Sequence, residues 1–377
     1  MIVFEDLISM ILIVYVWFRL YVNHRMTHEN KMTYFRGGVA LFLLLILDQV
    51  WQSFFITRSQ SPETDRLLNG ITCAIFFLIP LAMNSVARLF RKRMSFRIRM
   101  ANYLMMAVLT GIPVINLFVP ILFYHKDSIF FYAPFHLPYA LFELASMVFV
   151  VHVCYMRNFP FDRNDLVLVW FAQAIVTVGA AADLIYQALS VTWTSLVLCY
   201  LLLYLAIEFM YAKLDPVTML RNRDAYVGYL YRIGGRGFTA AVFDLNRLKS
   251  YNDRFGHVEG DTYLRAFAQT MHKELVLYGE IFRIGGDEFC FITKELSAQD
   301  AEMVIRKIRK TGKCRPEFGD YPIDFSFGIA ERARGENAYD TIERADAAMY
   351  EEKRLMHAHR REDVVSENGK SGDGMGD

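Results

Sequence analysis

The sequence predicts a multi-domain protein in which an all-α polytopic transmembrane bundle precedes an α/β domain. Of its 377 residues, 54% are hydrophobic and only 21% are charged, and the mean hydropathy is +0.21. This composition is too apolar for an ordinary soluble protein and indicates membrane spans. After Lys213, strand-like and helix-like patterns alternate and the charge becomes ordinary. We therefore expect a transmembrane region over 1–212, a folded domain over 213–360 and a polar, disordered tail over 361–377.

Each of seven apolar segments in the first region is roughly long enough to cross a bilayer as a helix, which takes about 20 residues. These segments are residues 7–22, 37–56, 67–87, 100–123, 130–155, 164–187 and 191–211. The first does not resemble a cleaved signal peptide, because Glu5 and Asp6 stand where basic residues should precede the apolar run. The split between the sixth and seventh segments is uncertain, so six or seven spans are expected.

Basic residues gather in every second connection between the segments. Arg25, Lys31 and Arg36 follow the first segment, RLFRKRMSFRIR follows the third and MRNFPFDR follows the fifth. Since basic loops mark the cytoplasmic side, we expect the N-terminus outside and the domain after Lys213 in the cytoplasm. The outer loops are short, so a signal would reach the bundle as a small or lipophilic ligand, or through lipid or a partner.

Ionisable residues within the apolar segments are candidates for a sensory site. Charges are costly in a membrane and usually face the bundle interior or a cavity, which makes a functional site the default hypothesis. The alternative is that they pair with one another or lie near an interface. Six such candidates are Asp48, His136, Glu143, His152, Asp183 and Glu208.

The second region shows its elements in sequence order. GFTAAVFDLN (237–246) is a strand ending in Asp244, and a helix follows with apolar residues at a spacing of three to four. EIFRI and FCFIT form a hairpin around a Gly-Gly-Asp-Glu turn. A helix opened by Ser297, a strand over 324–331 and a helix over 338–357 complete the domain.

Two carboxylates could meet at the end of this sheet. Asp244 ends one strand, and Asp287 lies in the hairpin turn behind two glycines. Mg²⁺ takes one or two carboxylates and completes its shell with phosphates and water, so the pattern favours a metal–nucleotide site. The alternatives are a plain hairpin tip and, for Asp244, a strand-end or turn residue.

Four motifs in order resemble the GGDEF domain, the catalytic domain of diguanylate cyclases. RIGGDEF (283–289) resembles its signature, and the resemblance extends from about 213 to 355. The other motifs are DPVTMLRNR (215–223), FDLNRLKSYNDRFGHVEGDTYL (243–264) and ADAAMYEEK (345–353). The resemblance implies a nucleotide-cyclase palm-like α/β fold in a bacterial inner-membrane protein. It also implies that two GTP molecules are joined into cyclic di-GMP at the interface of a homodimer, with Mg²⁺ or Mn²⁺ and no nucleic acid partner.

The resemblance also assigns site residues. Asp244, the Leu245 carbonyl and Asp287 match the metal ligands, and Asn252 and Asp261 match the positions that read guanine. An N-cap for Asp261 and a turn position for Asn252 are the alternatives.

The remaining assigned positions surround the phosphates and the reacting hydroxyl. Glu288 matches a position that deprotonates the attacking 3′-hydroxyl or holds a second metal, and both roles stay open. The others line the substrate or approach its phosphates, and they are Lys249, His257, Gly285, Gly286 and Lys353.

Four positions depart from the family pattern. Met219 stands where glycine is usual, and His357 stands where an arginine commonly contacts phosphate. Val276 and Gly279 replace the arginine and aspartate that bind product in many members, so inhibition through that site is not expected.

These departures leave room for other functions. One is a catalytically weak or inactive domain that acts as a membrane receptor for GTP or cyclic di-GMP. Another is a transporter or channel regulated by the domain, which the few intramembrane charges and the lack of an evident inverted repeat disfavour.

Overall fold

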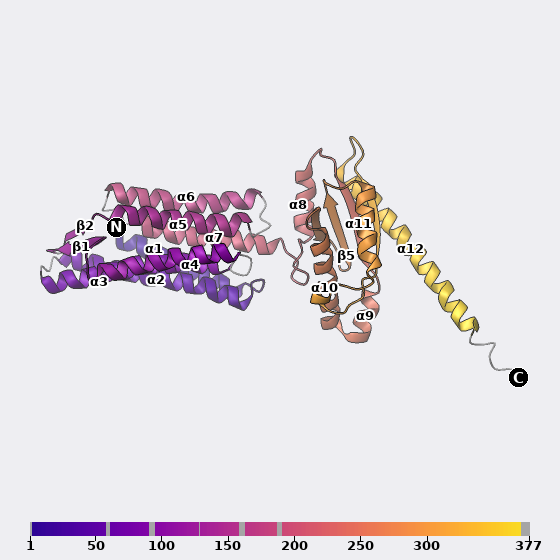
Figure 1. Ribbon diagram of the computed structural model, residues 1–377, viewed down its shortest axis with the longest axis horizontal. Helices are drawn as coiled ribbons and strands as arrows, with labels where there is room; N and C mark the ends of the chain where they lie inside the picture. Colours follow the sequence, from indigo (N-terminus) through magenta and orange to yellow (C-terminus); the bar gives the residue numbers. More distant parts are fainter. Residues whose placement is uncertain are drawn as a thin grey trace. The chain divides into compact units, whose positions relative to one another are not determined.

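The computed structural model describes residues 2–57, 61–89, 95–127, 129–157, 163–186 and 191–370. The chain divides into two compact units, Met1–Tyr211 and Ala212–Asp377. The first is helical, and the second contains a sheet with helices (Figure 1).

Each predicted apolar segment overlaps a helix of the first unit. These helices are α1 Ile2–Val22, α2 His28–Thr57, α3 Pro62–Leu89, α4 Phe96–Asn116, α5 His136–Arg157, α6 Arg163–Tyr186 and α7 Val191–Ala212. Within the described residues, four helical stretches are long and apolar enough to cross a membrane: His28–Phe54, Pro62–Ser85, Phe96–Asn116 and Val191–Ala212. A shorter apolar stretch, Val167–Asp183, lies in α6. The prediction of seven membrane spans is therefore not confirmed.

The expectation of an all-α first region is wrong at one place. β1 Phe123–Lys126 and β2 Ile129–Tyr132 form an antiparallel hairpin between α4 and α5, where the sequence predicts the ends of two helices. The Asn116 side chain redirects the backbone, because its Oδ1 accepts from the N–H of Leu122 at 2.7 Å and its Nδ2 donates to the Phe123 carbonyl at 3.0 Å. The Phe123 and Phe130 rings then stack across the hairpin.

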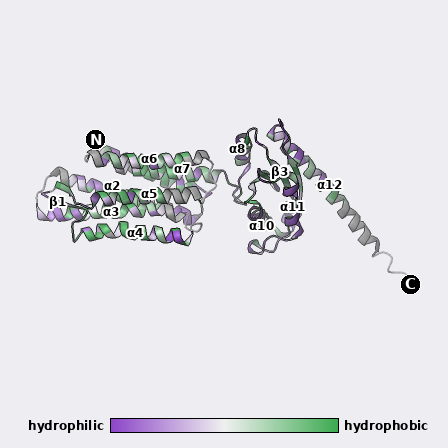
Figure 2. Cartoon of the chain, turned by 45° about the horizontal axis from the view of Figure 1, so that its top comes forward, coloured by the Kyte–Doolittle hydropathy of each residue, from purple (hydrophilic) through white to green (hydrophobic). Residues whose placement is uncertain are grey.

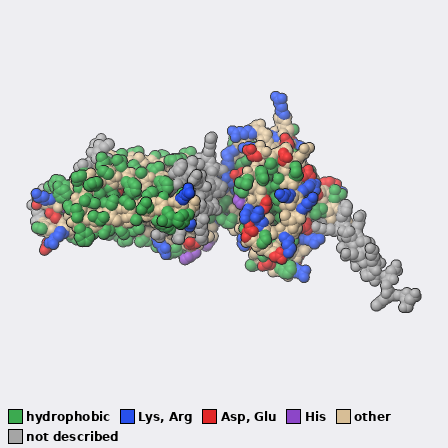
Figure 3. All heavy atoms as spheres, in the orientation of Figure 1, with side chains coloured by type: hydrophobic (Ala, Val, Ile, Leu, Met, Phe, Trp, Pro, Cys, Tyr) green, Lys and Arg blue, Asp and Glu red, His purple; other side chains and the backbone are tan. Residues whose placement is uncertain are grey.

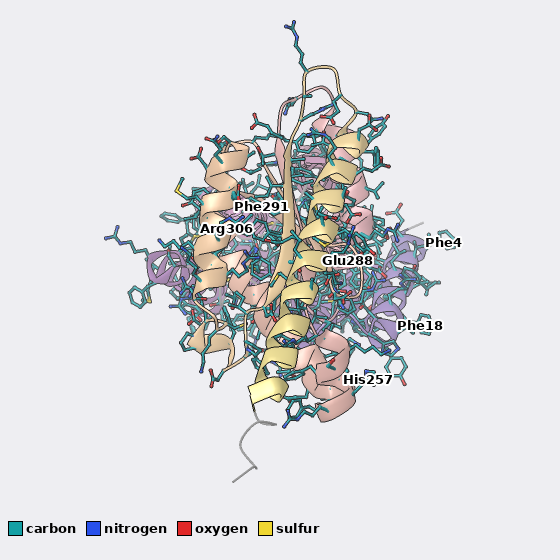
Figure 4. All side chains as sticks on the ribbon, turned by 90° about the vertical axis from the view of Figure 1, so that its right-hand side faces the viewer. Phe4, Phe18, His257, Glu288, Phe291 and Arg306 are labelled. Atoms are coloured by element: carbon teal, nitrogen blue, oxygen red, sulfur yellow. The ribbon has the colours of Figure 1, made fainter. Side chains whose placement is uncertain are left out.

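Apolar side chains cover most of the visible surface of the first unit, whereas that of the second mixes charged side chains with apolar and other atoms (Figures 2 and 3). Phe4 and Phe18 project outward from α1, with exposures of 66% and 61% (Figure 4). An apolar surface of this extent is typical of contact with lipid or with another protein.

The second unit is built on a four-stranded antiparallel sheet with strand order β4-β5-β3-β6. Its strands are β3 Thr239–Leu245, β4 Gly279–Arg283, β5 Glu288–Thr293 and β6 Phe325–Glu331. Its helices are α8 Arg223–Ile233, α9 Leu248–Phe255, α10 His257–Leu275, α11 Ala298–Lys310, the short 3₁₀ turn η2 Pro316–Phe318 and α12 Ala338–Lys370. The predicted strands, the hairpin and the helix opened by Ser297 are confirmed, whereas α8 and α9 were not predicted.

Helices cover both faces of this sheet. Successive strand residues point to opposite faces, so Ala241 and Phe243 pack in one core with residues of α10 and α11. Ala240 and Val242 pack in the other core with residues of α8 and α12. Every residue of β3 is therefore buried, which explains why this strand reads as a continuous apolar run.

The last helix is longer than the sequence indicates. α12 continues to Lys370, beyond the expected domain end near residue 360. Glu, Lys and Arg, which favour helix, are frequent after residue 350, and no glycine or proline interrupts the segment until Gly369. Residues 371–377 of the predicted tail lie outside the described residues.

Candidate functional site

Asp244, Asp287 and Glu288 belong to the same end of the sheet, where β3 and the hairpin end. The sheet register places Asp244 opposite Glu288, and the N–H of Leu245 donates to the Asp287 carbonyl at 2.9 Å. Asp244 is 5% exposed, whereas Asp287 is half-buried and Glu288 is exposed. The predicted proximity of Asp244 to the Gly-Gly-Asp-Glu turn is therefore confirmed. The residue directly opposite Asp244 in the sheet is Glu288, however, and not Asp287.

Lys353 of α12 reaches this end of the sheet. Its Nζ lies 2.7 Å from Asp244 Oδ2, with 31% and 7% of the two side chains exposed. Partial burial and the neighbouring carboxylates Asp287 and Asp244 raise the pKa of Glu288, while Lys353 opposes that rise. Glu288, which lies near α12 (Figure 4), is therefore a better proton acceptor than an ordinary glutamate.

Six predicted residues line one pocket of about 410 Å³ beside the turn. Further lining residues, not predicted, include Asp253, Gly260 and Arg283. The predicted positions that do not line it are Asp244, Leu245, Gly285, Glu288 and Lys353, which belong to the adjoining sheet end or turn. The six lining residues are Lys249, Asn252, His257, Asp261, Gly286 and Asp287.

The joint between α9 and α10 shapes the pocket floor. Gly256 has a φ of +84°, a conformation that favours glycine, and it ends α9 and starts α10 at His257 (Figure 4). Asp261 consequently lies inside α10 and does not cap it, and Asn252 lies inside α9 and not in a turn. The structural alternatives for both residues are therefore wrong.

Asn252 packs directly against Gly260. The buried Oδ1 of Asn252 has no hydrogen-bond partner among the described residues. An ideal Cβ built on Gly260 would overlap this oxygen and lie 2.7 Å from Asn252 Cγ. A buried amide without a partner is costly, so the side chain is suited to receive a polar ligand group.

Arg283 organises the glycine turn, and sequence reasoning missed it. Its Nη2 donates to the Gly286 carbonyl at 2.7 Å and its Nε donates to the Gly285 carbonyl at 3.2 Å, while Nη1 donates to Asp215 Oδ1 at 2.8 Å. Burial would raise the pKa of Asp215, but the Thr218 N–H and Arg283 outweigh it, and the pKa is lowered. The sequence did contain a signal for this role, since Arg283 and one apolar residue directly precede Gly285 and Gly286.

The donor atoms suit a hard divalent ion. No cluster of three or more His, Cys, Asp or Glu side chains able to hold a metal occurs among the described residues. Asp244, Asp287 and the Leu245 carbonyl offer oxygen only, which matches an ion that completes its shell with phosphate oxygens and water. The residues therefore fit a metal that arrives with a nucleotide.

The four departures have different structural outcomes. Met219 adopts a φ of +61°, which explains why glycine suits this position. Val276 is 47% exposed, and a Cβ on Gly279 would overlap the Ile292 carbonyl oxygen. A carboxylate at 279 would therefore require the strands to move. The side chain of His357 lies outside those described.

Residues 212–359 match the family described as diguanylate cyclase, GGDEF domain. Diguanylate cyclase VdcA of Vibrio cholerae is 32% identical over 152 residues, which cover 38% of this chain and 45% of VdcA. Diguanylate cyclase DgcP of Pseudomonas aeruginosa is 33% identical over 153 residues, covering 38% of this chain and 23% of DgcP. The chain thus spans less than half the length of these relatives.

Among solved structures, the GGDEF domain of DgcB from Caulobacter crescentus in complex with c-di-GMP is similar to this chain. It is 34% identical, and the alignment covers 38% of this chain and 88% of that solved GGDEF-domain chain, with a TM-score of 0.35.

Proposed function

We propose, from the premise that residues 212–359 are a GGDEF domain, that the protein is a membrane-bound diguanylate cyclase. It condenses two GTP molecules into cyclic di-GMP and releases two pyrophosphates. The observation that carries this proposal is the pocket beside the Gly-Gly-Asp-Glu turn, where an amide, a carboxylate and a lysine from α9 and α10 face the hairpin.

Guanine binds at the α9–α10 end of the pocket. The Asp261 carboxylate accepts from N1–H and the exocyclic amine of guanine, groups that adenine does not offer in that arrangement, and Asn252 supplies the amide. A site that pairs such groups discriminates strongly, because the wrong base leaves polar atoms unpaired. Lys249 and His257 flank the nucleotide, and Gly286 leaves room for phosphate at the turn.

The reaction joins the 3′-oxygen of one GTP to the α-phosphorus of the other and expels pyrophosphate. Glu288 accepts the hydroxyl proton, which its raised pKa favours. Asp244, Asp287 and the Leu245 carbonyl would hold Mg²⁺, or Mn²⁺ in its place, and such an ion would neutralise phosphate charge. Lys353 provides a further positive charge at the same end of the sheet.

Each GGDEF domain holds one GTP, so the reaction requires two copies of the chain facing each other. Lysine-rich and arginine-rich connections support a cytoplasmic domain attached to the inner membrane, with the N-terminus outside. α7 ends at Ala212, whose carbonyl accepts from Asn222 Nδ2 at 2.8 Å at the start of α8. A shift of α7 would therefore reach the domain without a long linker and control its pairing.

The test is pyrophosphate release and cyclic di-GMP formation from GTP and Mg²⁺ by the full-length protein in nanodiscs. Asp287→Asn should abolish product, whereas Asp340→Asn, which changes an exposed carboxylate in the first turn of α12, should not. Tight GTP binding without pyrophosphate would refute the cyclase and favour a nucleotide receptor.

A further inference from the structure

A cavity of about 280 Å³ lies inside the first unit, close to the lower end of volumes typical of small-molecule sites. Side chains of α2, α3, β2, α5, α6 and α7 line it. Four of the six ionisable residues predicted within apolar segments face it: Asp48, His136, Glu143 and Asp183. By contrast, Glu208 pairs with Arg19, which is not one of the six, and the side chain of His152 lies outside those described.

Among the described residues that line the cavity there are three carboxylates and neither lysine nor arginine. Asp48 Oδ1 accepts from Trp193 Nε1 at 3.0 Å, and its Oδ2 accepts from Gln52. Asp183 accepts from the backbone N–H groups of Val191 and Thr192 at 2.9 and 2.8 Å. All four donors are neutral, so they orient the two carboxylates without supplying a counter-charge.

Two further polar atoms of the lining lack partners among the described residues. These atoms are Glu143 Oε1 and His136 Nδ1, and His136 is only 9% exposed. Buried polar atoms of this kind are costly unless a ligand or water meets them. The cavity is thus polar where the carboxylates gather and incomplete as a hydrogen-bonding site.

Aromatic rings form much of the remaining wall: Trp51, Phe76, Phe130, Tyr132 and Trp193. The centroids of the Tyr132 and His136 rings lie 4.1 Å apart, so an aromatic ring packs against the histidine whose Nδ1 lacks a partner among the described residues. Aromatic faces attract cations, and they do so more strongly when the cation is withdrawn from water. Carboxylates without a counter-charge favour the same ligand, whereas an anion would be repelled by them.

We propose that this cavity binds a small organic cation, namely a protonated amine carried on an apolar body. The ammonium group lies among Asp48, Asp183 and Glu143, and the apolar part packs against the rings. This inference does not depend on the proposed cyclase activity, because it concerns binding within residues 1–211 alone.

Phenethylammonium is a suitable probe, with its neutral analogue phenethyl alcohol and the anion 3-phenylpropionate as controls. Binding to the full-length protein in nanodiscs can be followed by tryptophan fluorescence, since Trp51 and Trp193 line the cavity and the chain has four tryptophans. We expect the amine to bind at least about tenfold more tightly than the alcohol, and the anion not to bind.

Asp48→Asn should remove about tenfold of the affinity for the amine and leave the alcohol unaffected, because the amide keeps the Trp193 hydrogen bond. Glu63→Gln, which changes an exposed carboxylate in the first turn of α3, should change neither. Glu143→Gln provides a second cavity variant if Asp48→Asn does not fold. Equal binding of amine and alcohol by the native protein would overturn the proposal, as would displacement of the amine by millimolar Na⁺ or Mg²⁺.

Discussion

Replacing Gly260 by alanine should separate the stability of the domain from its nucleotide affinity. Gly260 lies inside α10, where glycine costs up to ~1 kcal/mol relative to alanine. The new methyl group, however, would overlap Asn252 Oδ1 and lie 2.7 Å from Cγ. Carbon atoms normally approach to about 3.5 Å, so Cγ alone would have to retreat by roughly 0.8 Å. The closer Oδ1 must move further than that, so the Asn252 side chain must change rotamer.

The displaced amide then no longer presents its oxygen at the pocket. If Asn252 contacts guanine, losing that contact should cost about 1–3 kcal/mol of binding free energy. This corresponds to a roughly 5- to 150-fold rise in the dissociation constant of GTP. By contrast, the free energy of unfolding of Gly260→Ala should be unchanged or slightly higher, because alanine favours the helix more than glycine does once the Asn252 side chain has moved.

A fluorescent GTP analogue reports affinity in nanodiscs, and hydrogen exchange of peptides from residues 212–359 reports domain stability. Gly228→Ala is the matched control, because Gly228 also lies inside a helix and only Arg232 Nη1, at 3.5 Å, comes near its Cβ position. It should gain stability and keep GTP affinity. In an Asn252→Ala background, adding Gly260→Ala should cause no further loss of affinity. Unchanged GTP binding by Gly260→Ala alone would refute the role of Asn252.

Four other variants test the neighbouring geometry. Gly286→Ala should fold normally, since no atom lies within 4 Å of the Cβ position of Gly286. Its GTP affinity should fall, because the new methyl group enters the pocket. An affinity equal to that of the native protein would show that phosphate does not bind at this turn. Met219→Gly should slow hydrogen exchange of the domain by stabilising it by about 1 kcal/mol, because Met219 has a φ of +61°; faster exchange would contradict the strain. The folded domain holds the Glu288 proton more tightly than the unfolded chain does, so this group's contribution to stability is lost as pH rises through its raised pKa. Glu288→Gln should therefore be increasingly more stable than the native domain above the ordinary glutamate pKa of about 4.3, and a constant difference from pH 4 to 8 would be the contrary result. Arg283→Lys keeps the positive charge but loses the planar set of donors that joins Asp215 to the glycine turn. The free energy of unfolding of the domain should therefore fall by about 1–3 kcal/mol, and its GTP affinity should fall as well. Loss of stability without loss of affinity, or the reverse, would contradict the idea that this one contact supports both the loop at Asp215 and the glycine turn.

The sequence allowed the sheet end to be predicted because the relevant signals are local. A β-prone run ending in Asp244 and a Gly-Gly turn between two strand patterns are both short-range features. The register that sets Asp244 opposite Glu288 follows from pairing those strands. Gly256 also carried a local signal, a helix-ending glycine between α9 and α10, and recognising it would have excluded the N-cap role of Asp261.

Other features depend on contacts between distant segments and leave no periodic pattern. Asp48 and Asp183 are 135 positions apart in the chain, and their shared cavity depends on how each helix is rotated within the bundle. An apolar helix that is hydrophobic on all sides does not reveal which face is buried. The same limit applies to the hairpin between α4 and α5, because its apolar strands read like the continuation of membrane helices.

Arg283 shows how such a distant contact could connect the two functions proposed for the chain. Asp215 follows the end of α7 by only a few residues, and its carboxylate accepts from Arg283 at 2.8 Å. The same guanidinium donates to the carbonyls of Gly285 and Gly286. The donors of a guanidinium group are fixed in one plane, so this side chain fixes the orientation of the groups that it joins as well as supplying charge. If the first region controls the domain as proposed, these contacts give a change at the end of α7 a short route to the glycine turn, through Asp215 and a single side chain.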